Sequence, residues 1–597
     1  MKLTVAQLVS DALAALPDLA EAAAGIKAVD TLERTRDPSH GDFASNIAMR
    51  LAKPARKNPR ELAAIIVAAL PETDAIAKTD VAGPGFINFT LSPTAFHAEI
   101  ETILDRGHEY GRRPHRNSPK ILLEFVSANP TGPLHVGHGR HAAYGATVGN
   151  LLEAMGYPVS REYYVNDAGR QMDILGVSVW LRWLEAQGTA VPFPGAGYRG
   201  DYIRDIAANI DATGIAVSEA DAVLDGVAAD GGKDKPDDTA EVRAANKAAR
   251  ETYVGVLVDR AKALLGDDGF DRVRQQSLEA IRADIEDDLA EFGVVFDTWY
   301  SEQSLTKTGR IDDALAVLRD RHMLYERDGA EWFPATNFGD EKDRVVVRDN
   351  GVKTYFASDI AYHFDKRERG FDHLIDILGA DHHGYVARVR GGLKAMGYDG
   401  DDLEVELVQF VTLYRGGEKM QMSTRSGEFD TLRQLRAEVG NDAARFYYVM
   451  RSNDQHLDFD LDVAKSQTKD NPVYYLQYAH ARIQSMLRKA EEDGISVSLD
   501  NGLTQLGLLE LAKEQALMRE LSRYPEIIEL AANNRAPQTL VHYLRDLASE
   551  FHSWYNDHRF LKDPDDLRDA RLVLSVAVRN VIANGLGILG VSAPESM

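Results

Sequence analysis

Cysteine is absent from this chain of 597 residues. Its absence excludes disulfide bonds, thiolate nucleophiles, zinc sites built on sulfur and iron–sulfur clusters. It also agrees with a reducing compartment, and we expect a cytoplasmic location. Any chemistry must therefore use oxygen and nitrogen groups or a bound cofactor.

Long apolar runs are also lacking. The most apolar segment, residues 572–591, contains Arg579 and Asn580, whereas a membrane span needs about 20 consecutive apolar residues. The N-terminal segment 1–16 is typical of an amphipathic helix, carries Asp11 and lacks a signal-peptide cleavage pattern. We therefore expect a folded protein that has no membrane partner.

Positive charge is in short supply, because 68 Lys and Arg face 93 Asp and Glu, a net charge of −25. Taken alone, this excess disfavours a polyanionic partner such as nucleic acid. Residues 201–300, however, contain 23 acidic and 11 basic side chains, so about half of the excess is local. Outside residues 201–300 the excess of acidic over basic residues is milder, so the composition is compatible with a local basic groove.

Length and local composition predict three parts and a mixed α/β fold. A small α/β module over residues 1–112 ends at the Pro- and Arg-rich connector 111–119. Residues 118–460 alternate β-rich and helical segments, as a parallel sheet with crossover helices does, and an acidic helical insertion interrupts them at about 190–290. Helical periodicity predicts an α-helical bundle over 461–597. The strands expected in the parallel sheet include 121–126, 161–166, 344–349, 374–379 and 405–413.

Residues 124–156 carry the clearest chemical signal. They form a strand, a loop rich in Pro and Gly, and a helix that ends near Gly156. The helix contains four glycines: Gly137, Gly139, Gly145 and Gly149. Each glycine costs about 1 kcal/mol relative to alanine, and close approach of a ligand or a neighbouring strand would offset that cost. The N-terminus of such a helix, at the carboxyl edge of a parallel sheet, is where phosphates bind.

His135 and His138 flank the helix start at a spacing that can turn both rings toward one ligand. Together with His141 and the pair His382-His383 they could form a zinc site, but no HExxH arrangement is present and a Gly-rich setting positions ligands poorly. They could also be ordinary packed or solvated histidines. We favour the interpretation that both donate hydrogen bonds to phosphate oxygens during transfer at the α-phosphate of ATP.

Leu134-His135-Val136-Gly137-His138 resembles the "HIGH" signature of class I aminoacyl-tRNA synthetases, and EKMQMSTRSGEF at 418–429 is similar to their second signature, "KMSKS". The second segment departs from its pattern, because Gln421 and Thr424 stand where lysine is usual. The resemblance implies catalytic roles for His135, Gly137, His138, Met422, Ser423 and Arg425. It places ATP against His135, Gly137, His138 and Met422. The cationic role would fall to Arg425, helped by Lys419 or Arg415.

Acidic and polar residues beside this helix favour a guanidinium substrate. Glu124 ends the first strand, Asn129 follows in the loop, and Tyr355 and Asp359 lie four residues apart, on one face if the segment is helical. Arginine is planar, always charged and offers five donors, so paired carboxylates bind it through both charge and geometry. A strand-end salt bridge for Glu124 and a helix cap for Asp359 are the alternatives.

Segments in order along the chain resemble arginyl-tRNA synthetases: 124–138, 163–171, 198–203, 296–305, 354–363 and 379–385. The resemblance implies a Rossmann-like class I catalytic domain with a small N-terminal α/β domain and a C-terminal helical bundle. It implies that L-arginine is held by Glu124, Asn129, Tyr355 and Asp359, with Asp381, His382 and Glu302 nearby. Asn166, Asp167 and Gln171 would line the same cleft.

The same resemblance implies an arginine–tRNA ligase that uses ATP and Mg²⁺. The arginine carboxylate attacks the α-phosphate of ATP, pyrophosphate leaves, and arginine then passes from arginyl-adenylate to the terminal adenosine of tRNA(Arg). No protein nucleophile is needed, which agrees with the absence of cysteine. We expect no metal site built by the protein itself, and a monomer.

The terminal parts resemble the RNA-binding modules of this family. Phe86 and Asn88 would touch the tRNA corner, although Phe86 could equally belong to a strand core. Residues 471–483 and 584–597 resemble the anticodon-binding domain, in which Tyr475, Tyr478 and Arg482 would face bases and a phosphate. Aromatic residues at helical spacing are usually core. Residues 461–597 hold 15 basic and 19 acidic side chains, so binding must depend on local patches.

Three further hypotheses stay open at this stage. Lysine would be the substrate if Glu124 and Asp359 point away from the pocket. A histidine-based metallohydrolase would use the histidines of both clusters. A catalytically silent tRNA-binding paralogue is suggested by Gln421 and Thr424.

Overall fold

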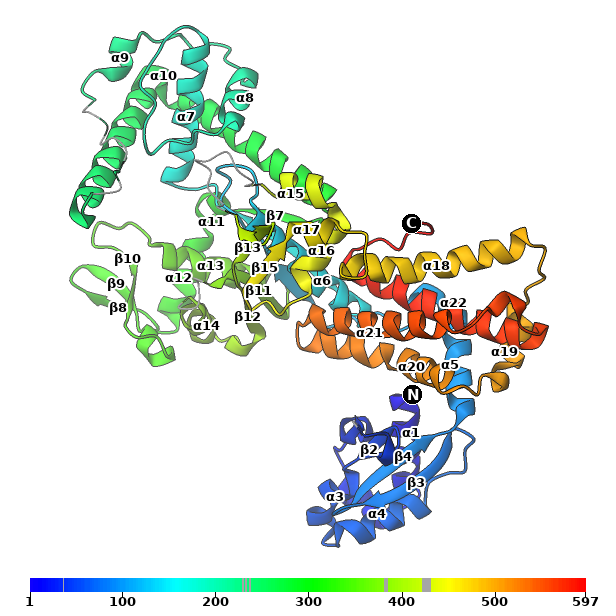
Figure 1. Cartoon of the computed structure of the whole chain (residues 1–597). Coiled ribbons are helices and arrows are strands. Elements are labelled where there is room, and N and C mark those ends of the chain that lie inside the picture. The colour runs from blue at the N-terminus through cyan, green and yellow to red at the C-terminus, as the bar shows by residue number, and fades with distance from the viewer. Residues whose placement is uncertain (36, 228–229, 231–233, 236–237, 381–384, 421–430) are drawn as a thin grey trace. The chain divides into compact units, whose positions relative to one another are not determined.

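A computed structural model describes residues 1–597 except 36, 228–229, 231–233, 236–237, 381–384 and 421–430. The chain divides into two compact units (Figure 1). The first combines Met1–Pro114 with Ser466–Met597, and the second is His115–Lys465.

The first unit begins with an antiparallel sheet of order β1-β2-β4-β3. Its strands are β1 (Leu32–Arg34), β2 (Phe43–Ser45), β3 (Ile76–Ala82) and β4 (Phe86–Leu91), and its helices are α1 (Lys2–Ala14), α2 (Ala20–Ala23), α3 (Ile47–Ala55) and α4 (Pro59–Ala68). In β4, Ile87, Phe89 and Leu91 are buried, because alternate side chains of a strand face the same side. The predicted α/β character of this segment is confirmed.

The same unit contains a helical bundle, as predicted. Its helices are α5 (Pro93–Arg106), α18 (Pro472–Glu492), α19 (Leu499–Thr504), α20 (Ala512–Asn533), α21 (Pro537–Asn556) and α22 (Asp565–Leu589). By length and composition α22, and the bent pair Lys2–Ala14 with Pro17–Ala23, could cross a membrane. The expectation that every apolar run is too short is therefore wrong for α22, since Arg579 and Asn580 leave it apolar enough on average. In the structure 72% of its most apolar stretch is buried.

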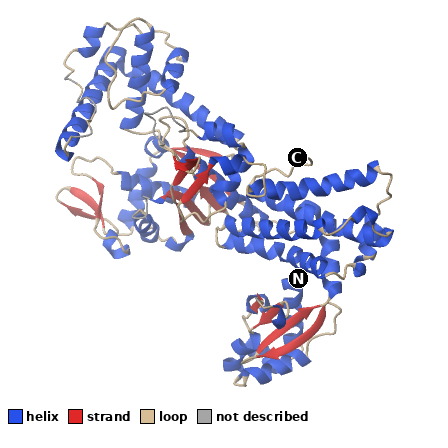
Figure 2. Ribbon diagram, in the orientation of Figure 1, coloured by secondary structure: helices blue, strands red, loops and turns tan. Residues whose placement is uncertain are grey.

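The second unit is built on a parallel sheet of order β12-β11-β5-β6-β7 (Figure 2). Its strands are β5 (Ile121–Glu124), β6 (Val159–Val165), β7 (Thr298–Ser301), β11 (His373–Gly379) and β12 (Leu403–Val408). All four residues of the central strand β5 are buried, as expected where both faces of a parallel sheet are covered. The predicted α/β fold class is confirmed.

Helices of the second unit follow or join these strands. They are α6 (Val136–Ala154), α11 (Glu302–Lys307), α12 (Arg310–Asp320), α13 (Tyr355–Glu368), α14 (Val386–Ala395), α15 (Leu432–Val439), α16 (Asn441–Val449) and α17 (Leu461–Lys465). The segment between β6 and β7 is helical and begins before the predicted insertion at about 190–290. Its helices are α7 (Arg170–Ala186), α8 (Asp201–Asn209), α9 (Ala220–Leu224) and α10 (Ala240–Glu291). Gly266, at φ 70° and ψ 163°, breaks the helical path inside α10.

Two strand predictions need correction. The run 344–349 forms β10 (Arg344–Val347), which pairs antiparallel with β9 (Ala330–Phe333) in a small sheet that also contains β8 (Tyr325–Arg327). The run 405–413 divides between β12 and β13 (Val411–Arg415), and β13 pairs with β14 (Glu418–Lys419) and β15 (Leu457–Asp460). Short β-branched runs look alike in any sheet, so their pattern could not tell which sheet they join.

Candidate active site

Two histidines cap the start of α6. His135 is the N-cap, and its Nδ1 accepts hydrogen bonds from the backbone N–H groups of Gly137 at 3.1 Å and His138 at 3.4 Å. His138 Nδ1 in turn accepts one from the His135 N–H at 3.3 Å. A neutral imidazole has one acceptor and one donor nitrogen. Each ring in its neutral form therefore carries its proton at Nε2.

The two rings are stacked, with centroids 3.5 Å apart. Burial lowers the pKa of His138 well below its ordinary value, and its charge interactions with His135 and His141 lower it further. His138 is therefore neutral at physiological pH and is an N–H donor at Nε2. A donor of this kind at the positive end of a helix suits a phosphate oxygen.

The glycines of α6 make room for side chains of the protein itself. An added Cβ would lie 2.7 Å from Leu432 at Gly139, 2.3 Å from the Phe125 ring at Gly145, and 2.9 Å from the Arg161 guanidinium at Gly149. At Gly137 it would meet only the His135 ring, at 2.9 Å. At three of the four glycines the close neighbour is thus a side chain of the protein and not the expected ligand or strand backbone. This side-chain packing offsets the low helix propensity of glycine.

The described chain resumes at Thr431, just after the second signature, and contacts the first signature there. The predicted residues Met422, Ser423 and Arg425, like Gln421 and Thr424, lie outside the described residues. Thr431 forms a β-bridge with His135, and the Leu432 N–H donates to the Leu134 carbonyl at 2.8 Å. The residues that follow the second signature, Thr431 and Leu432, therefore lie beside the capped start of α6.

The two cations considered as helpers of Arg425 differ in their surroundings. Arg415 forms an ion pair with Glu438 at 2.6 Å, so its charge is already balanced by a carboxylate. Lys419, at the end of β14, is exposed. Of the two, Lys419 is better suited to meet an incoming anion.

Three carboxylates surround the side chain of Tyr164: Glu302, Asp359 and Glu124. Burial raises the pKa of the Tyr164 hydroxyl, and the negative charges of the three acids raise it further. Glu124 ends β5, Glu302 begins α11 and Asp359 lies in α13. The fold thus brings acids from three distant segments to one place.

Two of these acids hold their protons unusually tightly. Burial raises the pKa of Glu302 to about 7, helped by the charges of Asp167 and Asp359. Burial also raises the pKa of Asp359 to about 6, although His363 and a hydrogen bond with Tyr385 act in the opposite direction. Among the described residues Glu302 Oε2 is buried without a hydrogen-bond partner. A buried acceptor of this kind favours a donor or cation supplied from outside.

The remaining predicted residues lie around this cluster or outside the described chain. Asn166 Nδ2 donates to Asn129 Oδ1 at 3.1 Å, which joins two predicted residues at the strand ends. Tyr355 is 77% exposed, and its hydroxyl lies 3.9 Å from an added Cβ at Gly169. Asp381 and His382 lie outside the described residues.

Asp167 was expected to line the cleft, but its carboxylate is engaged within the protein. Its Oδ2 accepts a hydrogen bond from the Ser301 hydroxyl at 2.5 Å, and its Oδ1 accepts one from the Gln303 N–H at 2.9 Å. These contacts fix the start of α11 and hence Glu302. Its contribution to the site is therefore indirect.

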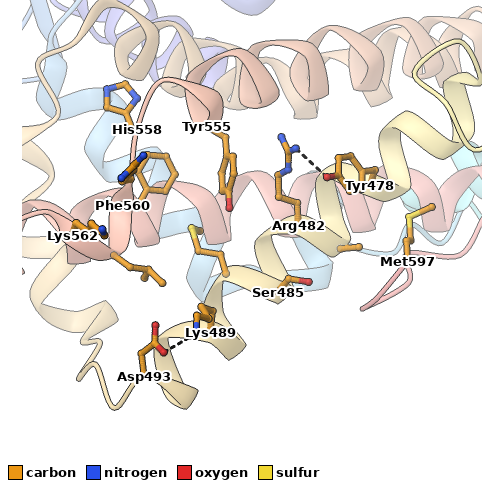
Figure 3. Close-up of a pocket in the computed structure, with 14 residues that line it drawn as sticks. Tyr478, Arg482, Ser485, Lys489, Asp493, Tyr555, His558, Phe560, Lys562 and Met597 are labelled. Atoms are coloured by element: carbon orange, nitrogen blue, oxygen red, sulfur yellow. Dashed lines mark hydrogen bonds and ion pairs between the residues drawn. The ribbon is translucent and has the colours of Figure 1, made fainter.

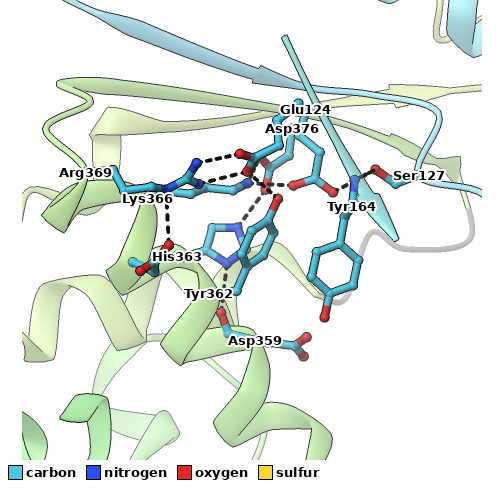
Figure 4. A network of polar contacts seen from close by, with 11 residues as sticks. Glu124, Ser127, Tyr164, Asp359, Tyr362, His363, Lys366, Arg369 and Asp376 are labelled. Atoms are coloured by element: carbon cyan, nitrogen blue, oxygen red, sulfur yellow. Dashed lines mark hydrogen bonds and ion pairs between the residues drawn. The ribbon is translucent and has the colours of Figure 1, made fainter. Parts of the chain in front are cut away.

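Sequence reasoning missed the polar residues beneath the acids. Lys366 is fully buried, and its Nζ donates to Glu124 Oε2 at 2.6 Å and to Asp376 Oδ1 at 2.8 Å (Figure 4). Glu124 does therefore form a buried ion pair at the strand end, the alternative considered for it. The spacing of Asp359, His363 and Lys366, which places them on one helical face, was the available signal.

A protein-built metal site finds no support in the described part of the chain. No group of three or more His, Asp or Glu side chains there could hold a metal ion. His135 and His138 use their Nδ1 atoms to cap α6. The zinc interpretation loses its first cluster, and its second, His382-His383, lies outside the described residues.

The bundle of the first unit contains a cavity of about 740 Å³ between α18, α21 and the segment after α21 (Figure 3). Aromatic and cationic side chains line it, among them Tyr478, Arg482, Lys489, Tyr555, Arg559 and Lys562. The Arg482 guanidinium lies 4.6 Å from the centroid of Tyr478 and 4.7 Å from that of Tyr555. Such a cavity can stack a flat ring and bind an anion.

The other predicted RNA contacts have mixed surroundings. Tyr475 packs on His552, with centroids 4.5 Å apart, beside the cavity but not in its lining. In β4, Phe86 is 37% exposed and Asn88 is 9% exposed. Phe86 therefore does not belong to the sheet core, the alternative considered for it.

Three family models match successive parts of the chain. Residues 4–91 match the arginyl tRNA synthetase N terminal domain, and residues 99–211 and 236–468 match the catalytic domain of class I (R) tRNA synthetases. Residues 476–597 match the DALR anticodon binding domain.

Relatives match over nearly the whole length. The arginine–tRNA ligase of Thioalkalivibrio sulfidiphilus is 57% identical over 96% of each chain, and that of Legionella pneumophila is 52% identical over 100% of each. Among solved structures, a putative arginyl-tRNA synthetase from Campylobacter jejuni is 30% identical with a TM-score of 0.70, over 85% of this chain and 100% of its own. The fold of the Thermus thermophilus arginyl-tRNA synthetase matches with a TM-score of 0.71 over 100% of each chain, at 24% identity.

Proposed function

This chain belongs to the arginyl-tRNA synthetase family, and from that premise we propose how its residues carry out the reaction of an arginine–tRNA ligase. The identity to such ligases runs along the full length of the chain, and nothing in it favours the silent paralogue. Its substrates are L-arginine, ATP and tRNA(Arg).

In our proposal, Glu302, Asp359 and Glu124 bind the two cationic groups of arginine. The buried Oε2 of Glu302, which has no hydrogen-bond partner among the described residues, supports this role most directly, because arginine can bring a charged donor to that oxygen. Asn129 and Tyr355 contact the substrate at the rim. Roles for Asp381 and His382 rest on the sequence resemblance alone.

Activation requires little covalent chemistry from the protein. The arginine carboxylate attacks the α-phosphate of ATP in line, and pyrophosphate leaves. His135 and His138 donate from Nε2 to the developing charge, beside the positive end of α6, and Gly137 keeps the backbone open there. Met422, Ser423 and Arg425 act on the pyrophosphate side, and Mg²⁺ enters as the counter-ion of ATP.

The terminal parts bind tRNA in this proposal. The bundle cavity takes an unstacked anticodon base beside its tyrosine rings, and the Arg482 guanidinium, which lies between Tyr478 and Tyr555, is within reach of a phosphate. Tyr475 supports that wall. On the N-terminal sheet the exposed Phe86 presents a second contact, and the mostly buried Asn88 can reach RNA only at its edge. We further propose a cytoplasmic monomer, because one chain contains all three parts.

The test is aminoacylation of total tRNA with each labelled amino acid, by the parent and a Glu302→Gln variant. The parent should charge arginine alone, and the variant should need roughly tenfold or more arginine, since a charged hydrogen bond contributes about 1.5–3 kcal/mol. Charging of lysine instead of arginine would show that lysine is the substrate. A folded parent that binds tRNA but charges no amino acid would establish the silent paralogue.

A further inference from the structure

A buried chain of charges connects the acids of the arginine site. Lys366 Nζ joins Glu124 to Asp376, at 2.6 and 2.8 Å, and Asp376 Oδ2 lies 2.7 Å from His363 Nε2. His363 Nδ1 lies 2.8 Å from the backbone carbonyl of Asp359. These four linked residues are at most 6% exposed. In Figure 4 this series of polar contacts runs from Glu124 through Lys366 and Asp376 to His363, in the helix that carries Asp359.

His363 joins this chain of contacts to the helix that carries Asp359. A backbone carbonyl only accepts hydrogen bonds, so Nδ1 donates to the Asp359 carbonyl. Nε2 lies 2.7 Å from Asp376 Oδ2, and the other oxygen of Asp376 accepts from the Lys366 ammonium. The Lys366 ammonium thus lies between two carboxylates, Glu124 and Asp376, and His363 connects Asp376 to the turn of Asp359.

The same contacts fix the orientation of Glu124. Its Oε2 accepts from Lys366, and its Oε1 accepts from the Ser127 hydroxyl at 3.0 Å. A carboxylate held at both oxygens keeps its plane, so the lone pairs that remain have fixed directions. A planar guanidinium forms directional hydrogen bonds that are stronger when the carboxylate orientation is fixed, whereas a compact ammonium depends little on that orientation.

We propose that Lys366 is a positioning residue that sets the selectivity of the pocket for a guanidinium. It acts directly on Glu124 and, through Asp376 and His363, on the helical turn that carries Asp359. The proposal rests on the arginine-binding roles proposed above for Glu124 and Asp359. In Figure 4 the Asp359 carboxylate and the Tyr164 hydroxyl extend away from Lys366, so Lys366 acts from behind the pocket.

The test replaces Lys366 by methionine and measures arginine-dependent aminoacylation. The KM for arginine should rise roughly ten- to hundredfold, the range of a charged hydrogen bond, whereas the KM for ATP should stay within about twofold. Citrulline has the shape of arginine without the charge, so its inhibition constant should rise less, and discrimination between the two should shrink. A merely structural role would lower the active fraction and leave that discrimination unchanged, which would overturn the proposal.

Lys366→Met removes the ammonium that both buried carboxylates share, leaves Asp376 with His363 alone, and could prevent folding. The double variant Lys366→Met with Asp376→Asn removes one charge of each sign, so we expect it to recover the melting temperature but not the affinity for arginine. Full recovery of the arginine KM in the double variant would contradict the proposal. Lys262→Met is the matched control, because it removes a lysine paired with Asp173 at 2.8 Å in the insertion.

Glu124→Gln separates this inference from the function on which it rests. If Glu124→Gln leaves the arginine KM unchanged, the proposed role of Glu124 in binding arginine is wrong. If Glu124→Gln raises the KM but Lys366→Met does not, the binding role stands and the inference about Lys366 fails. Both variants raising the KM, with reduced discrimination against citrulline, is the expected result.

Discussion

At the scale of single residues, the raised pKa values of Glu302 and Asp359 tie the affinity for arginine to pH. The pKa of Glu302 is about 7 and that of Asp359 about 6 in the empty site. Asp167 and Asp359 face Glu302, and His363, Arg388, Glu124 and Tyr385 face Asp359. Arginine requires both acids in their ionised form, so protons must leave as it binds.

We therefore predict that the KM for arginine rises roughly fifteenfold between pH 7.5 and pH 6, as the product of the ionised fractions of the two acids falls. In Glu302→Gln only Asp359 titrates, and the rise should shrink to about twofold. The pH dependence of the arginine KM in both proteins is the measurement. A flat profile in the parent would show that neither acid contacts the substrate.

Loss of folding cannot mimic this effect. A carboxyl group whose folded-state pKa is raised favours the folded protein increasingly as pH falls through that pKa. These two acids therefore add stability to the empty protein from pH 7.5 down to pH 6. A melting temperature measured at both values separates weaker arginine binding from unfolding.

The second residue-scale prediction separates the two nitrogens of His138. Nδ1 caps α6 and Nε2 donates to ATP in our proposal. An asparagine side chain is short, so in a His138→Asn variant its amide oxygen reaches the Nδ1 position and no group reaches the Nε2 position. A glutamine side chain is longer by one methylene group, and the two substitutions can therefore be compared.

His138→Asn should keep the melting temperature near that of the parent while adenylate formation slows about 100- to 1000-fold, the usual effect of losing one donor to the transition state. His138→Gln places its amide nitrogen near Nε2 and should retain more activity. Single-turnover formation of arginyl-adenylate compares the three proteins. Equal losses in both variants would mean that the donor at Nε2 is not what His138 contributes.

At the scale of elements, the start of α6 depends on close packing of its glycines. A Cβ at Gly145 would lie 2.3 Å from the ring of Phe125, which follows the central strand β5. The packing of helix against strand therefore sets where His135 and His138 lie. The sequence led us to expect that a ligand or a neighbouring strand approaches these glycines, and at Gly145 the close neighbour is the side chain that directly follows a strand.

Gly145→Ala should lower the free energy of unfolding by about 1–3 kcal/mol, because overpacking outweighs the gain in helix propensity. Gly587→Ala in α22 is the control, since nothing lies within 4 Å of its added Cβ, and it should stabilise by up to about 1 kcal/mol. Urea denaturation measures both. A neutral Gly145→Ala would mean that Phe125 moves aside at little cost.

Elements were easier to predict than their partners. The strand, loop and helix at 121–154 follow from local patterns, because the apolar run, the turn residues and the helical period lie within one segment. The contact between Lys366 and Glu124 joins residues 242 positions apart, and no local pattern carries such information. Asp359 was predicted because of its own charge. His363 and Lys366 lie on the same helical face, but their role depends on contacts with Glu124 of β5 and Asp376 of β11, which the sequence does not show.

At the scale of the whole molecule, the net charge of −25 raises the question of how the chain binds a polyanion. The bundle segment 461–597 has more acidic than basic residues. Four of its 15 basic side chains nevertheless lie together, because Arg482, Lys489, Arg559 and Lys562 line the same cavity, where Asp493 pairs with Lys489. Local concentration of charge, rather than the overall balance, then governs the interaction with phosphates.

We predict that Arg559→Gln combined with Lys562→Gln raises the KM for tRNA about tenfold near physiological salt. The slope of log KM against log salt should fall by one to two, because each phosphate that the variant no longer neutralises lowers it by about one. The KM values for arginine and ATP should not change, because the cavity belongs to the other unit. The control, Lys513→Gln with Arg545→Gln, makes the same change in net charge on α20 and α21 outside the cavity lining. If the control weakens tRNA binding as much, overall charge rather than this cavity determines the interaction.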